Sequence, residues 1–286
     1  MKTTLARILF LLLLLSPAIG SAQDFSVKYG GDAGTQATNV PYSAMFGNSA
    51  GQVMNNALYG TAIGPSAGRY ANGAEGAVII GLAAGYASVS INYSTLIGYA
   101  AGRAITGNTY SQIIGYAAGE YANNSHLSNF IGHHAGYKAS DSASSVMVGR
   151  FAGAWADHSP ESVFIGSHAG GVEKLDAQTE IPSAHHVVSG IYIGAGAGKD
   201  SVNTTDVILV GTNSKADSGV ENAIALGKDA HATVSNSMNV PVLRRTGGGV
   251  LVVDDNGNIT PSDQLATALA TIAALTARIE ALEAAP

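Results

Sequence analysis

The sequence predicts an all-β fold: a solenoid of about eleven coils, each seventeen residues long, followed by a short C-terminal coiled-coil helix. A phrase of the form apolar, Ile or Val, Gly, any two residues, Ala, Gly recurs along most of the chain, for example as LIGYAAG at 96–102. Most of its leading glycines follow one another at a fixed interval of seventeen, and a fixed period of this kind indicates stacked structural units. Apolar residues at a spacing of seven then follow near the end of the chain.

Residues 1–22 have the features of a secretory signal peptide. Lys2 and Arg7 supply positive charge, eight apolar residues follow at 8–15, and small residues lead to an expected cleavage site after Ala22. The alternative, a membrane-spanning helix, needs about 20 apolar residues, which is more than this run contains. We therefore expect export, with the mature protein secreted or at the cell surface.

Composition excludes several classes of function. The chain has no cysteine, so it has no disulfides and no thiolate metal sites. Without the two basic residues of the signal peptide, 14 − 2 = 12 basic residues face 20 acidic ones, a net charge of −8. This acidic balance gives no electrostatic basis for binding nucleic acid or an anionic membrane.

The repeat array is predicted to span 41–235, after a glycine-rich N-terminal cap at 23–40. Seventeen residues fit one coil of a narrow solenoid with two short strands and two turns. We expect the Ile or Val before each leading glycine (for example Ile80, Ile97, Ile114 and Ile131) to point inward, together with the alanine three residues after that glycine. Each glycine permits the tight turn between coils. The leading glycines are Gly47, Gly64, Gly81, Gly98, Gly115, Gly132, Gly149, Gly166, Gly194, Gly211 and Gly227.

One interval of the array, between Gly166 and Gly194, is stretched beyond the usual period by an insert within 171–188. The insert is polar and contains Pro182, so we expect it to loop out of one coil without breaking the stack. A competing interpretation of the whole array is the left-handed helix of hexapeptide acyltransferases. That fold has a slightly longer coil with an aliphatic residue at every sixth position, and the present sequence lacks this six-residue periodicity.

A neck and a helix are expected after the array. Residues 236–262 contain Val250 to Val253, an Asn-Gly turn and Ile259, which predict a small β-hairpin. Residues 263–286 carry a heptad seam and an Arg-h-x-x-h-Glu pattern found in trimeric coiled coils, which favours a trimer. The alternative is an amphipathic helix docked on its own chain. The expected trimerisation residues are Leu265, Ile272, Leu275, Arg278, Ile279, Leu282 and Glu283.

Glycine-led coils followed by a neck and a heptad helix resemble the head domains of YadA-type trimeric autotransporter adhesins, and related modules of tail-fibre-like surface proteins. The resemblance covers the array at 41–235 together with the neck and the stalk. It implies a left-handed parallel β-roll in each of three chains, and binding to host, matrix or other surfaces. Two departures are that the coil here is longer than the family's common head repeat, and that no series of membrane-anchor strands follows the helix. We therefore expect release, or anchoring by an unidentified membrane or fibre partner.

When the coils are aligned, each position of the coil forms a column of residues along the stack. The two columns that directly follow the leading glycine vary in chemistry, so we expect them to face outward or between chains. The first column contains Tyr99, Tyr116, His133 and Arg150. At a coil spacing of ~4.8 Å these four would form a ladder about 15 Å long. The ladder is interpreted either as a binding strip for an extracellular protein or glycan surface, or as packing between chains of the trimer.

Histidines raise the question of a metal site. His134 and His168 share a column but are two coils, ~10 Å, apart, which is too far for one zinc ion. A threefold axis would be needed to bring three copies of one histidine together, and His185-His186 is interpreted as part of a solvated loop. We predict no metal, no cofactor and no enzymatic activity, because the array lacks the motifs of catalysis. The rival functions are a purely structural subunit of a surface appendage and a polysaccharide-acting trimeric β-solenoid enzyme.

Overall fold

The computed structural model describes residues 26–171, 186–199, 201–240, 250–253, 259–262 and 264–283. The chain divides into two compact units, Met1–Pro241 and Val242–Pro286. The predicted signal peptide (1–22), most of the predicted insert and the predicted Asn-Gly turn of the neck lie outside the described residues.

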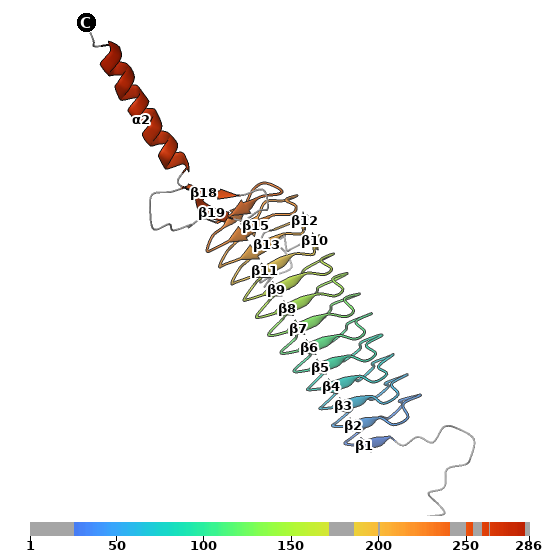
Figure 1. The fold of residues 1–286 in the computed structure, drawn as a ribbon. Helices are drawn as coiled ribbons and strands as arrows, with labels where there is room; N and C mark the ends of the chain where they lie inside the picture. Colours follow the sequence, from blue (N-terminus) through green and yellow to red (C-terminus); the bar gives the residue numbers. More distant parts are fainter. Residues whose placement is uncertain are drawn as a thin grey trace, which may run out of the picture. The chain divides into compact units, whose positions relative to one another are not determined.

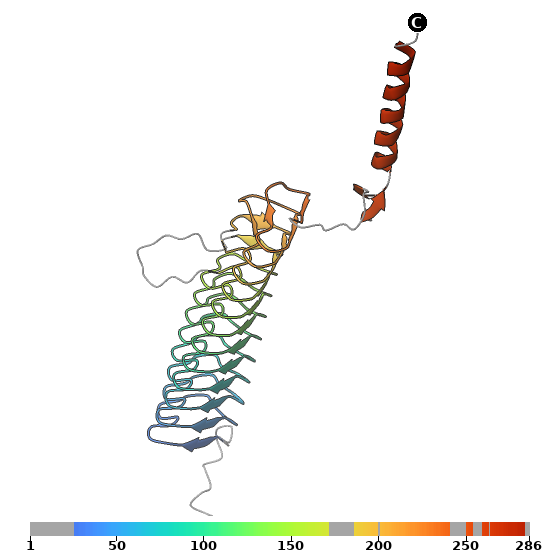
Figure 2. The same ribbon diagram turned by 90° about the vertical axis from the view of Figure 1, so that its left-hand side faces the viewer.

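The first unit is a parallel β-solenoid of about twelve turns (Figures 1 and 2). Short strands from successive coils form one 13-stranded parallel sheet in chain order. Each strand pairs with the next at the same position of the coil, as Thr95 does with Gln112. The strands of this sheet are β1 Val27–Tyr29, β2 Ala44–Phe46, β3 Thr61–Ile63, β4 Val78–Ile80, β5 Thr95–Ile97, β6 Gln112–Ile114, β7 Asn129–Ile131, β8 Val146–Val148, β9 Val163–Ile165, β11 Ile191–Ile193, β13 Ile208–Val210, β15 Ile224–Leu226 and β17 Met238–Asn239.

The other side of each coil is joined to its neighbour more sparsely. From Thr38 to Asp157, one residue per coil forms an isolated parallel bridge with its counterpart one period later. Figure 2 shows the strands stacked along one side of the solenoid and the turns along the other. In the last coils the bridges become two-stranded sheets, formed by β10 Val187–Val188 with β12 Thr204–Thr205 and by β14 Lys215–Ala216 with β16 His231–Ala232.

The middle residue of each strand fills the core, which corrects one sequence-based prediction. Leu96 and Ile113 are fully buried. Ile97 and Ile114, which were expected to point inward, are only partly buried. The reason is that side chains alternate across a strand, so a three-residue strand with an inward middle residue turns its last residue outward. The expectation for the alanines is confirmed, because Ala84, Ala101, Ala118 and Ala135 are all buried.

The last residues of the strands therefore form an outward row, here called the apolar stripe. The exposed fractions of Ile63, Ile131 and Ile193 are 39%, 36% and 37%. Because the strands stack in register, the row continues from β2 to β15. The stripe consists of Phe46, Ile63, Ile80, Ile97, Ile114, Ile131, Val148, Ile165, Ile193, Val210 and Leu226.

Close approach of successive coils explains the leading glycines. Gly132 has φ of +134°, and a Cβ placed on it would lie 2.6 Å from the carbonyl oxygen of Gly149. Only glycine combines this dihedral angle with this proximity. Gly30 continues the same column, and β1 pairs with β2 in register, so regular coils extend into the segment that was expected to be a cap.

A column of buried serines ties neighbouring coils together inside the solenoid. The backbone N–H of Ser145 donates to Ser128 Oγ at 3.1 Å, and Ser128 Oγ donates to the carbonyl of Ser142 at 3.0 Å. The hydroxyl is thus satisfied twice, which offsets the cost of burying it. The same column contains Ser94, Ser111, Ser145 and Ser162.

The second unit contains a strand pair and a helix. Strand β18 (Val250–Val253) pairs antiparallel with β19 (Ile259–Ser262). Helix α2 spans Gln264–Glu283. No helix in the described part of the chain combines the length and the apolar character needed to cross a membrane.

Candidate binding surface

Three of the four residues expected to form a ladder stack face to face. The ring centroids of Tyr99 and Tyr116 are 4.9 Å apart with planes 10° apart, and those of Tyr116 and His133 are 5.0 Å apart with planes 8° apart. These residues occupy one position of successive coils, so the coil spacing sets the ring spacing. In the single chain, 48% of Tyr99 and 49% of Tyr116 are exposed.

Beyond His133 the stack moves to the neighbouring column. Arg150 follows His133 in the original column, but its guanidinium carbon lies 4.8 Å from the ring centroid of Phe151. Phe151 stacks between His134, at 5.0 Å, and His168, at 5.3 Å. The phenylalanine therefore separates the two histidines that share this column. We call the whole row the aromatic ladder: Tyr99, Tyr116, His133, His134, Phe151 and His168.

A second aromatic group lines an open cleft of about 670 Å³, at the turn that precedes the bridge residues. Its rings tilt instead of stacking. Tyr137 lies 6.1 Å from Tyr121 at 85°, and 5.9 Å from Trp155 at 65°. This aromatic cleft is lined by Tyr121, Asn123, Tyr137, Lys138, Ser140 and Trp155, which come from three successive coils.

Charged side chains lie both in the aromatic cleft and beside it. The ammonium group of Lys138 lies 4.0 Å from the ring centroid of Trp155, a cation–π contact. Beside the cleft, Arg103 forms an ion pair with Glu120. Burial raises the pKa of the Tyr137 hydroxyl, and the Glu120 carboxylate raises this pKa further. Tyr137 therefore presents a neutral hydroxyl at physiological pH.

Sequence reasoning missed two further stacked pairs, although their spacing of one period is visible in the chain. Tyr42 and Tyr59 stack at 5.3 Å, and Tyr93 and Tyr110 stack at 5.2 Å. The Tyr93 hydroxyl donates to a Glu75 carboxylate oxygen at 2.6 Å, and this hydrogen bond raises the pKa of Tyr93. A search for aromatic residues at the fixed period would have found both pairs.

Comparison with known proteins adds one structural match. No protein-family model and no curated protein matches the chain. Among solved structures, it is similar to the crystal structure of the collagen-binding domain of the Yersinia adhesin YadA, at 13% identity over 87% of this chain and 99% of that chain. The TM-score of the match is 0.25. The solenoid fold rests on the coil geometry described above.

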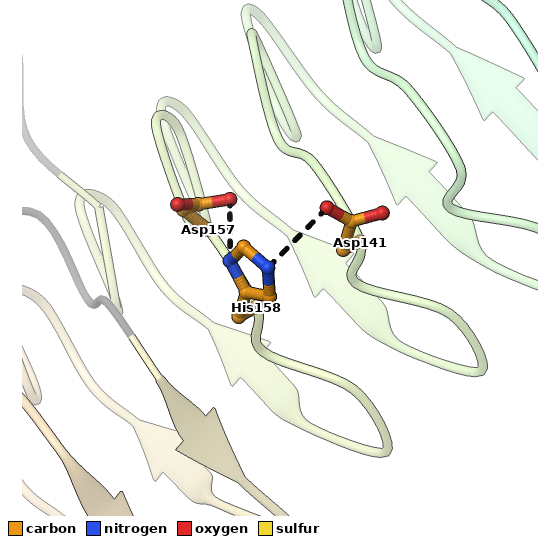
Figure 3. A group of neighbouring side chains, drawn as sticks. All are labelled: Asp141, Asp157 and His158. Carbon is orange, nitrogen blue, oxygen red and sulfur yellow. Dashed lines mark ion pairs between the residues drawn. The ribbon is translucent and has the colours of Figure 1, made fainter.

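A polar cluster occupies the side of the coil that carries the bridges (Figure 3). His158 Nδ1 lies 3.0 Å from an Asp157 carboxylate oxygen, and His158 Nε2 lies 3.5 Å from an Asp141 carboxylate oxygen. The three side chains offer ligand atoms within 4.8 Å of one another, a spacing that a divalent cation accepts. Both ring nitrogens are already engaged by carboxylates, however, and we assign the cluster to contacts between coils.

The histidine pair of the insert is only partly described. His186 stacks on His158 at 4.9 Å with ring planes 4° apart, and so continues the column of the polar cluster. His185 lies outside the described residues. In place of the solvated loop expected for the pair, His186 belongs to a coil.

The expected trimerisation residues lie on helix α2 of the second unit. The exposed fractions of Ile272, Leu275 and Ile279 are 59%, 55% and 55%, and Arg278 is also exposed. The helix thus leaves its described heptad residues uncovered in the single chain. The side chains of the remaining members lie outside the described residues: Leu265, Leu282 and Glu283.

Proposed function

We propose that the protein is an adhesin, an exported surface or fibre protein that binds host, matrix or environmental surfaces through the outer faces of its solenoid. The observation that carries this proposal is the row of stacked aromatic rings on a rigid scaffold, in which Tyr99, Tyr116 and His133 are exposed. Aromatic side chains bury large areas on contact and dominate binding hot spots. A scaffold whose coils are joined by backbone hydrogen bonds also lowers the ordering cost of binding.

We further propose that three copies assemble through the apolar stripe and helix α2. A continuous apolar row is unusual on the surface of a monomeric protein, and it typically marks an interface. The exposed heptad residues Ile272, Leu275 and Ile279 support the same conclusion, because a single exposed helix of about 20 residues is marginally stable in water. The aromatic cleft belongs to a different side of the coil, so association along the stripe leaves it open.

A purely structural appendage subunit is the second candidate. The apolar stripe supports it as well as it supports an adhesin, because assembly alone would require such a surface. The aromatic residues distinguish the two functions. A structural subunit has no need for large rings on the sides that its partner chains leave uncovered.

Adhesion of coated beads tests the proposal. Beads carrying residues 23–286 are applied to matrix proteins, cultured cells and polysaccharides, and retained beads are counted. We expect retention on at least one surface, and a reduction of roughly tenfold or more after Tyr99→Ala and Tyr116→Ala together. The matched control is Tyr42→Ala with Tyr59→Ala, which removes another stacked pair. Failure of the wild-type protein to bind any surface would favour the structural subunit.

A further inference from the structure

We propose that the aromatic cleft is a saccharide-binding site, which takes one or two sugar rings of a surface polysaccharide. The inference rests on the proposed adhesive function and narrows it to a class of ligand and a site. The first support is composition: small-ligand sites combine aromatic walls with a few convergent polar groups. This cleft joins three aromatic rings to an amide, a hydroxyl and an ammonium group.

Ring orientation separates the cleft from the aromatic ladder. In the ladder, the planes of Tyr99 and Tyr116 are 10° apart, so neighbouring rings cover each other's faces and leave mainly their edges to solvent. In the cleft, Tyr137 is tilted by 85° to Tyr121 and by 65° to Trp155, so neighbouring rings meet at an angle instead of stacking in parallel, and Lys138 lies over the Trp155 ring. A sugar ring carries C–H groups on its flat faces and hydroxyls at its rim. Tilted aromatic rings suit the faces of such a ligand.

Polar groups at the cleft suit the rim of the same ligand. The side-chain amide of Asn123 has no hydrogen-bond partner within the described part of the chain, and it offers both a donor and an acceptor to a sugar diol. Ser140 Oγ donates to an Asp157 carboxylate oxygen and keeps acceptor capacity for a ligand hydroxyl. Lys138 forms no ion pair among the described residues, so its ammonium group is available to hydroxyl or carboxylate oxygens.

The choice of residue at one turn position gives further support. Trp155 has φ of +65° there, a region that is strained for any residue with a Cβ, and φ is positive at the same position of the other coils, as at Gln36 and Tyr70. Ala87 and Ala104 hold this position at φ of +53° and +55°, so the turn itself accepts a small side chain. The turn therefore does not require the large ring of Trp155.

The ligand class follows from charge and shape. The acidic chain disfavours nucleic acid, which requires a basic surface. An extended peptide would bind best to an unpaired strand edge, whereas the bridge residues Asn123 and Ser140 are paired with their neighbours in the stack. The cleft also extends along the coil axis, with Tyr121, Lys138 and Trp155 at one position of three successive coils. A polymer of sugar units can follow such a row.

Fluorescence of Trp155 provides the test, because it is the only tryptophan in the chain. The mature protein is titrated with soluble oligomers of glucose, mannose, N-acetylglucosamine and galacturonic acid, and heats of binding are measured in parallel. We expect a saturable fluorescence change and binding heat with at least one oligomer. Tyr137→Ala should weaken that binding by roughly tenfold or more, as truncation of an aromatic anchor does. Tyr110→Ala, outside the cleft, should leave it unchanged.

The unfolding midpoint of each variant is measured to check that it folds. Trp155→Phe serves as a further control, because it keeps an aromatic ring. In calorimetry Trp155→Phe should retain more affinity than Trp155→Ala. No fluorescence change and no heat with any oligomer would overturn the saccharide site, even if coated beads still adhered to protein surfaces. Binding that is insensitive to Tyr137→Ala would also overturn it. Oligomer binding without bead adhesion would instead support the site and refute the adhesive function.

Discussion

The apolar stripe and the aromatic cleft are both outward surfaces of the same coils, yet they differ in every respect that matters for function. The stripe repeats almost one residue type, so that Ile97, Ile114 and Ile131 occupy equivalent places. The cleft uses a different residue at each place, with Tyr121, Lys138 and Trp155 at one position of three coils. A uniform column indicates that every coil needs the same residue type at that position. A mixed column indicates a position that accepts different residues, and such a position can contribute to a local binding site.

This difference suggests a division of roles, in which the stripe joins chains and the aromatic surface contacts ligands. Both depend on the inner columns of glycine, alanine and serine, which fix the distance between coils. Changes to the inner columns should therefore disturb both surfaces together. Changes to one outer surface should leave the other intact.

Breaking the glycine column should have the largest effect. In Gly132→Ala, the new Cβ would meet the carbonyl oxygen of Gly149 at 2.6 Å, so the coils must separate. We expect a loss of at least about 3 kcal/mol in the free energy of unfolding, together with loss of assembly and adhesion. Gly219→Ala is the control, because it has a positive φ but open space around the new Cβ. If chemical denaturation showed equal losses of unfolding free energy in Gly132→Ala and Gly219→Ala, the role given to close contact between coils would be refuted.

Charging the stripe should separate assembly from binding. Ile97→Glu with Ile114→Glu would place carboxylates in the proposed interface, where burial without a partner is costly. Sedimentation equilibrium should show the mass of a single chain, while oligosaccharide binding per chain is unchanged. The control pair Val89→Glu and Thr106→Glu occupies exposed bridge positions of successive coils and should keep the mass of three chains. A single-chain mass for the wild-type protein would contradict the proposed trimer.

Ionisation of a core tyrosine should destabilise the solenoid at high pH. Burial raises the pKa of Tyr192 to about 12, above the usual value of 10.0, and its hydroxyl shares a 2.6 Å hydrogen bond with Thr204. The neutral hydroxyl is therefore favoured in the folded state, and its contribution to stability is complete below pH 10. Between pH 10 and about 12 the free energy of unfolding should fall by roughly 2–3 kcal/mol.

Tyr192→Phe provides the matched variant for this alkaline loss. It should reduce the fall seen in denaturation curves above pH 10, because the buried hydroxyl that ionises is then absent. An unchanged alkaline loss in Tyr192→Phe would show that another group titrates.

The smallest effect should come from the strained turn position that Trp155 shares. Ala104 has φ of +55° there, and glycine adopts this conformation without a Cβ penalty. Ala104→Gly should therefore raise the free energy of unfolding by about 0.5–1 kcal/mol. Ala101→Gly, in the core of the same coil, should lower it by about 1 kcal/mol. Shifts of the thermal unfolding midpoint in opposite directions for the two variants would support the strain assigned to the position of Trp155. A lower midpoint in both variants would contradict it.

The period predicted the solenoid because glycine and alanine columns are imposed by backbone contact, which leaves little choice of residue. It did not reveal which face of the strand is inward, since Leu96 and Ile97 are both apolar and only the geometry of the turn distinguishes them. The first coil escaped notice because Lys28 and Tyr29 stand where an apolar pair precedes other leading glycines. Its glycine and alanine spacing nevertheless follows the rule.

The predicted ring contacts are found where one column makes the contact and are missed where two columns meet, and the binding role of these residues stays a prediction. Tyr99, Tyr116 and His133 stack as their common position predicts. Arg150 shares that position, but its long side chain lies over Phe151 instead. The cleft combines Tyr137 with Trp155 from the neighbouring column, and a reading of single columns does not bring them together.

The most direct test of the division between the two surfaces is bead adhesion by one triple variant, Tyr99→Ala, Tyr116→Ala and Trp155→Ala, compared with the wild-type protein at equal coating density. All three residues lie outside the apolar stripe, so assembly should persist; loss of assembly would instead show that the ladder packs between chains. We predict that the triple variant loses adhesion while it retains the sedimentation mass of the wild-type protein. Full adhesion by a correctly assembled triple variant would contradict the assignment of binding to the aromatic surface.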